Sequence, residues 1–311
     1  MDFLILIGGI AGLWLGTELT IGGAMAIARR HQLSEFFVGL VILSIGSDLP
    51  ELAVAVDAGL KGLLGQDASG VVVGTSIGSS VAQIGFVLGL AGMISYLTLP
   101  RGFVFRHGTV LLGATLLLFA VAFDGQISRM DGLILVGAYG AYVLALMNGA
   151  NVPDQQPRSL ARGGFKSWLA LVAGLAVVIG SSEITVSTVV RIAHELDISE
   201  AVISVLISGL GTSLPELSIS ISAILKKRTG LSVGNIIGSN ILDTLLPIGV
   251  AAVISSLTFD RQLLFFDLPF LFVLTAVVLA FFITRRGVER PEAIVTLGLY
   301  AAYVAVKLLQ F

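Results

Sequence analysis

The chain has 311 residues, of which 56% are hydrophobic and only 12% are charged, whereas soluble globular proteins contain about 25% charged residues. This composition, with a mean hydropathy of +0.99, excludes a soluble enzyme. The net charge of −2 leaves no electrostatic footprint for nucleic acid, and the absence of cysteine excludes disulfides and thiolate metal sites.

Apolar runs long enough to cross a bilayer follow one another along almost the whole sequence. A membrane-spanning helix needs about 20 apolar residues. Runs such as Gly108 to Phe123 are continuous, which excludes the alternating pattern of a membrane β-barrel. The first run follows Met1-Asp2-Phe3 without a basic segment, so we expect a span and not a cleaved signal peptide. Ten helices are expected, at residues 3–27, 34–60, 69–95, 104–123, 132–147, 167–192, 199–225, 229–256, 266–283 and 292–309.

The longest polar gap divides these helices into two sets of five. It runs from Asn148 to Lys166 and contains Pro153 and Pro157, a composition typical of a linker. We therefore expect a first half at residues 1–147, a linker at 148–166 and a second half at 167–311. If successive spans alternate in direction, 13 of the 18 Lys and Arg residues fall on the side of the linker. The positive-inside rule then predicts a cytoplasmic linker and two extracellular termini.

The two halves contain related sequences. Leu33 to Glu51 resembles Ile198 to Glu216 at a constant offset of 165 residues, and Gly74 to Gln83 resembles Gly234 to Asp243 at an offset of 160. Because each half has an odd number of spans, the two copies must cross the membrane in opposite directions. The sequence therefore predicts an all-α membrane protein of ten transmembrane helices in two inverted five-helix repeats.

Acidic residues inside the expected spans are the main candidates for function, because ionisable groups in a membrane are costly. No lysine or arginine is expected at the same depth to pair with them. The compensating partner would then be a bound cation or a proton. Asp57 lies near the end of its span, where we expect a solvated side chain. The seven acidic residues are Glu18, Asp48, Glu51, Asp57, Glu183, Glu216 and Asp243.

Oxygen-bearing side chains recur with helical spacing beside these acids. Asp48 and Glu51 are three residues apart, as are Ser213 and Glu216, so each pair shares one helix face. Two further sets have members four residues apart, and hard cations such as Ca2+ and Na+ prefer such oxygen ligands. These sets are Thr75, Ser79 and Gln83 in the first half, and Asn235, Ser239 and Asp243 in the second.

Pro50 and Pro215 occupy matching places beside the acidic pairs, and Gly46 and Gly211 precede them. Proline lacks the backbone donor that a helix interior needs. We therefore expect both helices to kink or break there, which would free carbonyl groups toward a cavity at the membrane midplane.

These motifs resemble the two α-repeats of the cation/Ca2+ exchanger superfamily, with most similarity to prokaryotic sodium/calcium exchangers. The residues that carry the resemblance are Gly211-Thr-Ser-Leu-Pro-Glu216 with Gly234-Asn-Ile-Ile-Gly-Ser-Asn240 and Asp243, and Gly46-Ser-Asp-Leu-Pro-Glu51 with Gly74-Thr-Ser-Ile-Gly-Ser79. The segment from Phe123 to Gly132 is also similar to that family, so the resemblance covers essentially the whole chain.

The resemblance implies an antiporter that works by alternating access, in which Ca2+ and Na+ compete for overlapping sites. Glu51 and Glu216 would be matched acidic anchors, and the serines of the two ladders would line the same cluster. The first and sixth helices would be the moving gate, with Glu18 and Glu183 either lining it or forming structural hydrogen bonds. Carbonyls near Ser44, Gly46, Gly209 and Gly211 would complete the ion shells.

The first half departs from the pattern of the family. Ser47-Asp48 replaces the usual Thr-Ser, and Thr75 and Gln83 stand where asparagine is usual. Asp48 therefore brings the cluster to four carboxyls, and four adjacent anions cannot all stay ionised without compensation. We expect at least one protonated carboxyl in the ion-free protein, which makes H+ a candidate counter-ion beside Na+.

Three alternatives stay open on the sequence alone. The changed ligands are compatible with antiport of another cation, namely Mg2+, Mn2+ or K+. Paired membrane aspartates also occur in intramembrane aspartyl proteases, although Gly46-Ser47-Asp48 lacks the glycine that usually precedes the aspartate. An ion channel would conduct without a counter-ion.

We expect no enzymatic activity and no organic cofactor, since the predicted chemistry is exchange of ion ligands only. The expected partners are inorganic cations and the lipid bilayer. The compact size suggests a multi-pass protein of a prokaryotic plasma membrane. The sequence is equally compatible with a monomer and a homo-oligomer.

Overall fold

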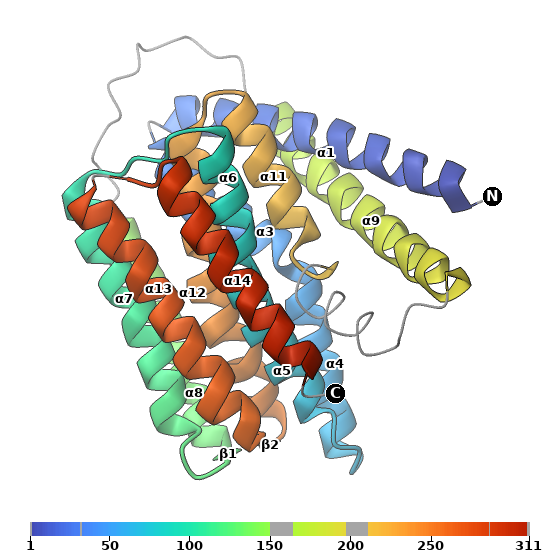
Figure 1. The fold of residues 1–311 in the computed structure, drawn as a ribbon, viewed down its shortest axis with the longest axis vertical. Helices are drawn as coiled ribbons and strands as arrows, with labels where there is room; N and C mark the ends of the chain where they lie inside the picture. The colour runs from blue at the N-terminus through green and yellow to red at the C-terminus, as the bar shows by residue number, and fades with distance from the viewer. Residues whose placement is uncertain (1, 32, 150–163, 197–210, 286, 310–311) are drawn as a thin grey trace.

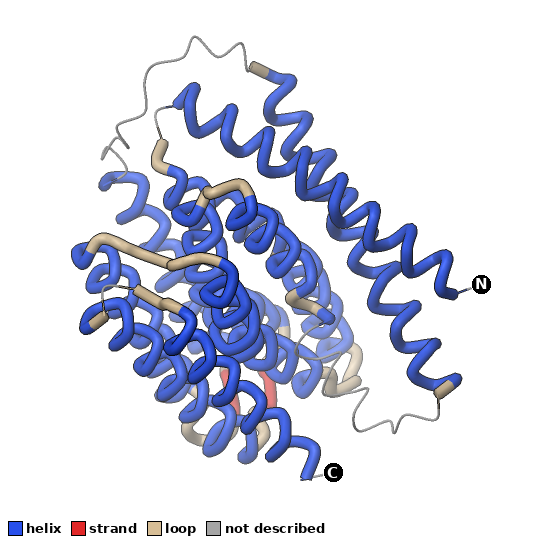
Figure 2. Tube along the Cα trace, turned by 45° about the horizontal axis from the view of Figure 1, so that its top comes forward, coloured by secondary structure: helices blue, strands red, loops and turns tan. Residues whose placement is uncertain are grey.

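The computed structural model describes residues 2–31, 33–149, 164–196, 211–285 and 287–309. Almost all of these residues are helical (Figures 1 and 2). The first half contains α1 (Asp2–His31), α2 (Glu35–Phe37), the π-helical segment η1 (Val38–Leu43), α3 (Ser44–Ser47), α4 (Leu49–Leu63), α5 (Ser69–Ala82), η2 (Gln83–Val87), α6 (Leu88–Ile94), α7 (Arg101–Val121), β1 (Gln126–Ile127) and α8 (Arg129–Gly149). The second contains α9 (Phe165–Glu195), α11 (Leu214–Leu225), α12 (Thr229–Ile254), β2 (Leu257–Thr258), η4 (Leu263–Asp267), α13 (Leu268–Thr284) and α14 (Arg290–Leu309).

The expected membrane-spanning architecture is confirmed. Within the described residues, eight helices are long and apolar enough to cross a bilayer, and Glu35–Ser47 with Leu49–Leu63 forms a ninth, bent by 45°. The tenth expected span, 199–225, is described only from Gly211, and its α11 is shorter and apolar. The expected linker at 148–166 lies largely outside the described residues, so its boundaries stay a prediction.

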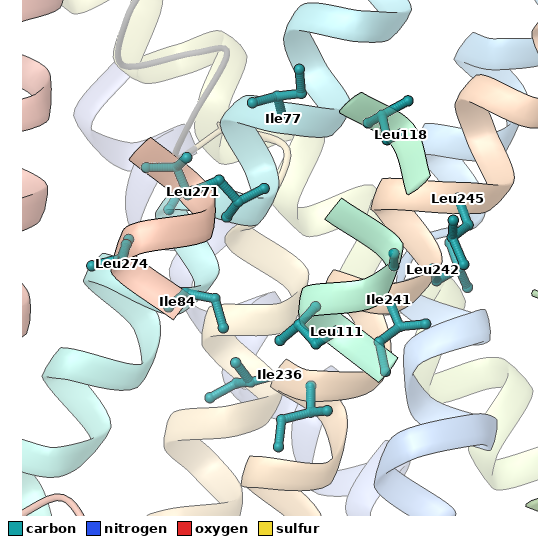
Figure 3. Packing of buried hydrophobic residues seen from close by; sticks show 14 of the residues in the cluster. Ile77, Ile84, Leu111, Leu118, Ile236, Ile241, Leu242, Leu245, Leu271 and Leu274 are labelled. Carbon is teal, nitrogen blue, oxygen red and sulfur yellow. The ribbon is translucent and has the colours of Figure 1, made fainter. Parts of the chain in front are cut away.

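Helix α12 is the centre of the bundle. Every residue from Leu231 to Leu245 is buried, because α4, α5, η1, α7, α8 and α11 all pack against it. Figure 3 shows Ile236, Ile241 and Leu242 among aliphatic side chains of neighbouring helices. Such a helix, apolar on all sides, is suited only to a buried position. Polar side chains on α12 are therefore held deep inside the protein.

Helices α1 and α9 form a long antiparallel pair along one edge of the bundle (Figures 1 and 2). Glycines allow their backbones to approach closely, since a Cβ atom added at Gly16 would lie 2.9 Å from the backbone nitrogen of Val178. Small residues at the interface are the usual means of close helix packing in membranes. A hydrophobic cluster separate from the main core joins this pair to α11 and η1.

Two short β contacts tie the halves together. β1 pairs antiparallel with β2 through Gln126 with Thr258 and Ile127 with Leu257, and an isolated bridge joins Leu97 to Val288. Each contact joins the segment after the third expected helix of one half to the segment before the fifth helix of the other. The same connection thus occurs twice, as expected of two inverted repeats.

The packing of α1 on α9 predicts different outcomes at two glycines of the same helix. Gly16→Val should destabilise the protein by about 1–3 kcal/mol, because the added carbons overlap Val178. Gly22→Val is the matched control, since the position of its Cβ atom is open space. Thermal unfolding in detergent measures both. Equal melting temperatures for the two variants would contradict the close packing.

Candidate cation centre

The chain breaks its helical path at two matching positions. Asp48, with φ −87° and ψ 8°, separates α3 from α4, and Pro50 lies in the first turn of α4. Ser213, with φ −86° and ψ 9°, precedes α11, whose first turn contains Pro215. Asp48 and Ser213 are related by the offset of 165 residues. The predicted break is confirmed in the first half, while the residues before Gly211 in the second half, including Gly209, lie outside the described part.

These breaks bring carboxylates of both halves together. Asp48, Glu51 and Glu216 each offer one carboxylate oxygen, and the three atoms lie within 4.8 Å of one another. All three side chains are buried. In the described part of the chain, no lysine, arginine or histidine forms an ion pair with any of them. Negative charge at this point has no protein counter-ion.

Asp243 of α12 is the fourth carboxyl of the group. It is fully buried and interacts electrostatically with Asp48 and Glu216. Gln83 Nε2 donates to Asp243 Oδ2 at 3.0 Å, and Asn240 Nδ2 donates to Gln83 Oε1 at 2.7 Å. Gln83 therefore orients Asp243, which leaves its Oδ1 atom free.

Five carboxylate oxygens of this group are buried without a hydrogen-bond partner among the described residues. Such atoms are rare in proteins, because a buried acceptor without a partner costs free energy. A site for a cation or a proton accounts for them together. They are Asp48 Oδ2, Glu51 Oε2, both oxygens of Glu216, and Asp243 Oδ1.

Serine hydroxyls close the group from two sides. Ser239 Oγ donates to Asp48 Oδ1 at 2.9 Å. Ser213 Oγ lies 3.3 Å from Ser79 Oγ, which connects α11 to α5. The structure thus brings Ser79, Ser213 and Ser239 to the carboxyls, as the ladders predicted. Their role as ligands stays a prediction.

Thr75 and Asn235 are more peripheral. Thr75 Oγ1 donates to the Val71 carbonyl oxygen of its own helix at 2.7 Å, and its side chain lies on the wall of a cavity described below. Asn235 Nδ2 donates to Ser220 Oγ at 3.2 Å, while its Oδ1 is buried without a partner. Both residues keep lone pairs that can face an ion.

Four neighbours of the centre were not among the predicted site residues. Ser47 Oγ donates to Asp48 Oδ1 at 3.2 Å, and Thr212 Oγ1 lies 2.6 Å from Ser79 Oγ. Asn240 and Ser220 support Gln83 and Asn235. Ser47 and Thr212 are related by the same offset of 165, so the repeat itself contained the signal that would have found them.

A cavity of about 300 Å3 leads to this group. Glu51, Pro50 and Pro215 line its inner end, and Val186 and Ser187 of α9 line the part toward the end of that helix. The pair Arg191 Nε and Asp2 Oδ1, 3.1 Å apart, places that end of α9 beside the start of α1. The cavity therefore extends from the carboxyls toward the side on which α1 begins.

The two glutamates considered for a gate differ in their surroundings. Glu183 lines the cavity. Glu18 does not, since Lys226 Nζ lies 2.6 Å from its Oε2 atom. The expectation that no basic residue pairs with the acids of the spans was therefore wrong for Glu18, because Lys226 at the end of α11 reaches back to α1. Asp57, expected to be solvated, is exposed and pairs with Lys61 at 2.7 Å.

Comparison with known proteins gives one consistent result. The sequence matches the family described as sodium/calcium exchanger protein over residues 1–148 and 166–309. This chain belongs to that family. The agreement over nearly the full length confirms the resemblance seen in the α-repeat motifs.

Relatives of this exchanger are similar over their whole length. Sodium/calcium exchanger MaX1 of Methanosarcina acetivorans is 28% identical over 98% of this chain and 98% of its own. Uncharacterized membrane protein MJ0091 of Methanocaldococcus jannaschii is 31% identical over 96% and 95%. A solved structure of the sodium-calcium exchanger NCX_Mj, soaked with Na+ and Ca2+, has a TM-score of 0.83, with 27% identity and coverage of 98% and 97%.

Family membership confirms the predicted class of function. The protein is a multi-pass membrane antiporter of inorganic cations, and the family is one of transporters and not of enzymes. The comparisons give no support to the intramembrane protease.

Two buried aspartates should respond in opposite ways to the same substitution. Asp48→Asn should stabilise the ion-free protein by about 1–3 kcal/mol, because a buried charge without a counter-ion is removed. Asp267→Asn is the matched control and should destabilise it by about 3–5 kcal/mol, since Asp267 is paired with Lys307 and bonded to Tyr303. Thermal unfolding at pH 8 with a chelator measures both. Destabilisation by Asp48→Asn would contradict the assignment.

Proposed function

We propose that this exchanger carries Ca2+ in one direction and Na+ in the other, and that both ions use the group formed by Asp48, Glu51, Glu216 and Asp243. The observation that carries the proposal is the set of five buried carboxylate oxygens that lack a partner among the described residues. A cation would neutralise them, and the family gives the class of cation.

The spacing of the carboxylates favours Ca2+ and Na+ over a smaller ion. Atoms up to 4.8 Å apart leave room for an ion about 2.4 Å from each, within the 2.3–2.6 Å typical of Ca2+. Mg2+ requires distances of about 2.0–2.1 Å and usually keeps several waters. Glu51 and Glu216 would be the anchors, one from each half. Ser79, Ser213 and Ser239 would add hydroxyl oxygens, with Thr75 and Asn235 at the periphery and Gln83 orienting Asp243.

The same charges explain why transport is coupled. An empty centre carries repelling carboxylates that no basic residue offsets, so closing the membrane around it is unfavourable. With a cation bound, the charge is compensated and the closed state becomes accessible. The carrier therefore changes sides when loaded, which produces exchange without a separate energy source.

The orientation follows from charge distribution. Thirteen of the 18 basic residues lie on the side where α1 ends, so that side would be cytoplasmic and both termini extracellular. The cavity would then face the outside. The archaeal relatives favour a prokaryotic plasma membrane.

Uptake of 45Ca2+ into proteoliposomes tests the proposal. An outward Na+ gradient should drive uptake in the unmodified protein, and Glu216→Gln should reduce it at least tenfold, because one anchor loses its charge. Glu292→Gln, far along the chain at the start of α14, is the matched control and should leave uptake unchanged. Addition of Mg2+, Mn2+ or K+ in excess should compete weakly. Uptake that is independent of Na+ and of H+ would overturn the proposal.

Asp48 gives a specific reason to test H+ as counter-ion. It adds a carboxyl where the family usually has a hydroxyl, and one proton shared in this group would balance part of the charge. An outward H+ gradient should therefore drive some 45Ca2+ uptake in the unmodified protein. Asp48→Ser should abolish the H+-driven part and retain the Na+-driven part. Equal loss of both parts would show that Asp48 serves only as an ion ligand.

A further inference from the structure

On the side where α1 ends, two side-chain contacts fasten α1 to α11. Lys226 Nζ lies 2.6 Å from Glu18 Oε2, and Ser222 Oγ donates to Thr17 Oγ1 at 3.0 Å. The nearby pair of Arg228 with Glu35, 2.6 Å apart, places this end of α11 beside the residues that follow α1. We call the set Thr17, Glu18, Ser222 and Lys226 the first latch.

All four positions of the first latch have counterparts in the other half at the offset of 165 residues. Glu18 corresponds to Glu183 and Lys226 to Lys61, with both charges retained. Thr17 corresponds to Ser182, which keeps the hydroxyl, and Ser222 corresponds to Asp57. We call Asp57, Lys61, Ser182 and Glu183 the second latch. Its acidic and hydroxyl members lie on α9, and the other two lie on α4.

The second latch is open in this structure. Ser182 and Glu183 line the cavity between α9 and α4, and no described residue pairs with the Glu183 carboxylate. Lys61 Nζ instead lies 2.7 Å from Asp57 Oδ2, on its own helix. One latch is therefore closed and its counterpart is open, on opposite sides of the carboxyl group.

We propose that the two latches alternate: when the cavity closes, Glu183 pairs with Lys61 and Ser182 meets Asp57, while Glu18 separates from Lys226. This inference rests on the alternating access of the proposed function. The helical spacing is suitable, since Lys61 follows Glu51 by the same ten residues that separate Lys226 from Glu216. A contact that forms in one copy is therefore within reach in the other.

The close packing of α1 on α9 explains why the latches exclude one another. The two helices are antiparallel and packed along their length, so they are suited to move as one unit. A displacement that carries Glu183 toward Lys61 carries Glu18 away from Lys226. Neither pair needs to be strong, because each has only to shift the balance between two conformations of similar free energy.

Asp57 makes the two latches unequal. When the second latch is open, Lys61 retains Asp57 as a partner, whereas Lys226 has a serine at the corresponding position. Opening the second latch thus leaves fewer charges without a partner than opening the first. The difference favours the conformation with the cavity open.

The absence of cysteine in this chain allows a direct test. Val186→Cys places a thiol on the cavity wall, and its labelling by a membrane-impermeant maleimide in spheroplasts reports the fraction with the cavity open. Lys226→Gln in this background should slow labelling about two- to fivefold, the effect of one part-exposed ion pair on an equilibrium. Lys61→Gln added to Lys226→Gln should restore the rate, because both latches are then lost.

Two further variants guard against damage to the fold. Glu18→Lys combined with Lys226→Glu should restore the original rate, since the pair is rebuilt with the charges exchanged. Lys166→Gln, which removes an exposed lysine from the same side as Lys226, is the matched control and should have no effect. A rate that does not fall in Lys226→Gln, or that stays low after Lys61→Gln is added, would overturn the latches.

The labelling does not depend on which ion is carried. If labelling changes as expected but no gradient drives 45Ca2+ uptake, the latches stand and the ion assignment fails. If Na+ drives uptake but labelling is unchanged in every variant, the exchanger stands and the latches fail.

Discussion

Four carboxyls buried without a basic partner are the constraint on which the rest of this structure depends. A single ionised carboxylate in a membrane is unfavourable, and here Asp48, Glu51, Glu216 and Asp243 interact with one another at the centre of the bundle. Local structure cannot have produced this group for stability, because most of its free oxygens have no donor. The protein instead holds them with rigid surroundings. Helix α12 is buried over the full stretch that contains Ser239 and Asp243.

The surroundings are built so that polar groups support the carboxyls without neutralising them. Gln83 fixes one oxygen of Asp243 and is itself fixed by Asn240, while Ser47 and Ser239 fix one oxygen of Asp48. In each carboxylate the second oxygen stays free. This arrangement orients ligands and leaves their charge available, which is the condition for a site that binds and releases ions. A lysine or arginine at the same place would stabilise the fold and abolish the site.

Much of this could be predicted from the sequence because the patterns are long and occur twice. The apolar runs identify the spans, and the break at Asp48 follows from Pro50 and Gly46 with the acidic pair beside them. Side-chain contacts between distant helices could not be predicted in the same way. The spacing that places Thr75, Ser79 and Gln83 on one face of α5 does not say that Gln83 meets Asp243 or that Thr75 bonds to its own helix. Likewise, Lys226 was expected in a loop, and only the packing of α11 on α1 shows that it reaches Glu18.

The inverted repeat gives the molecule two possible forms, and the differences between the copies decide which form is favoured. A perfectly symmetric repeat would leave the two sides of the membrane equivalent, because every contact closed on one side would have an identical counterpart on the other. This chain is not symmetric at the positions that matter. Asp48 corresponds to Ser213, Gln83 to Asp243 and Asp57 to Ser222, so each half supplies an acid where the other has a neutral group. The first two differences place four carboxyls in the centre, and the third lies outside it, near the end of α4. The repeat therefore explains how exchange is possible, and its imperfections explain how ion preference and direction are adjusted separately.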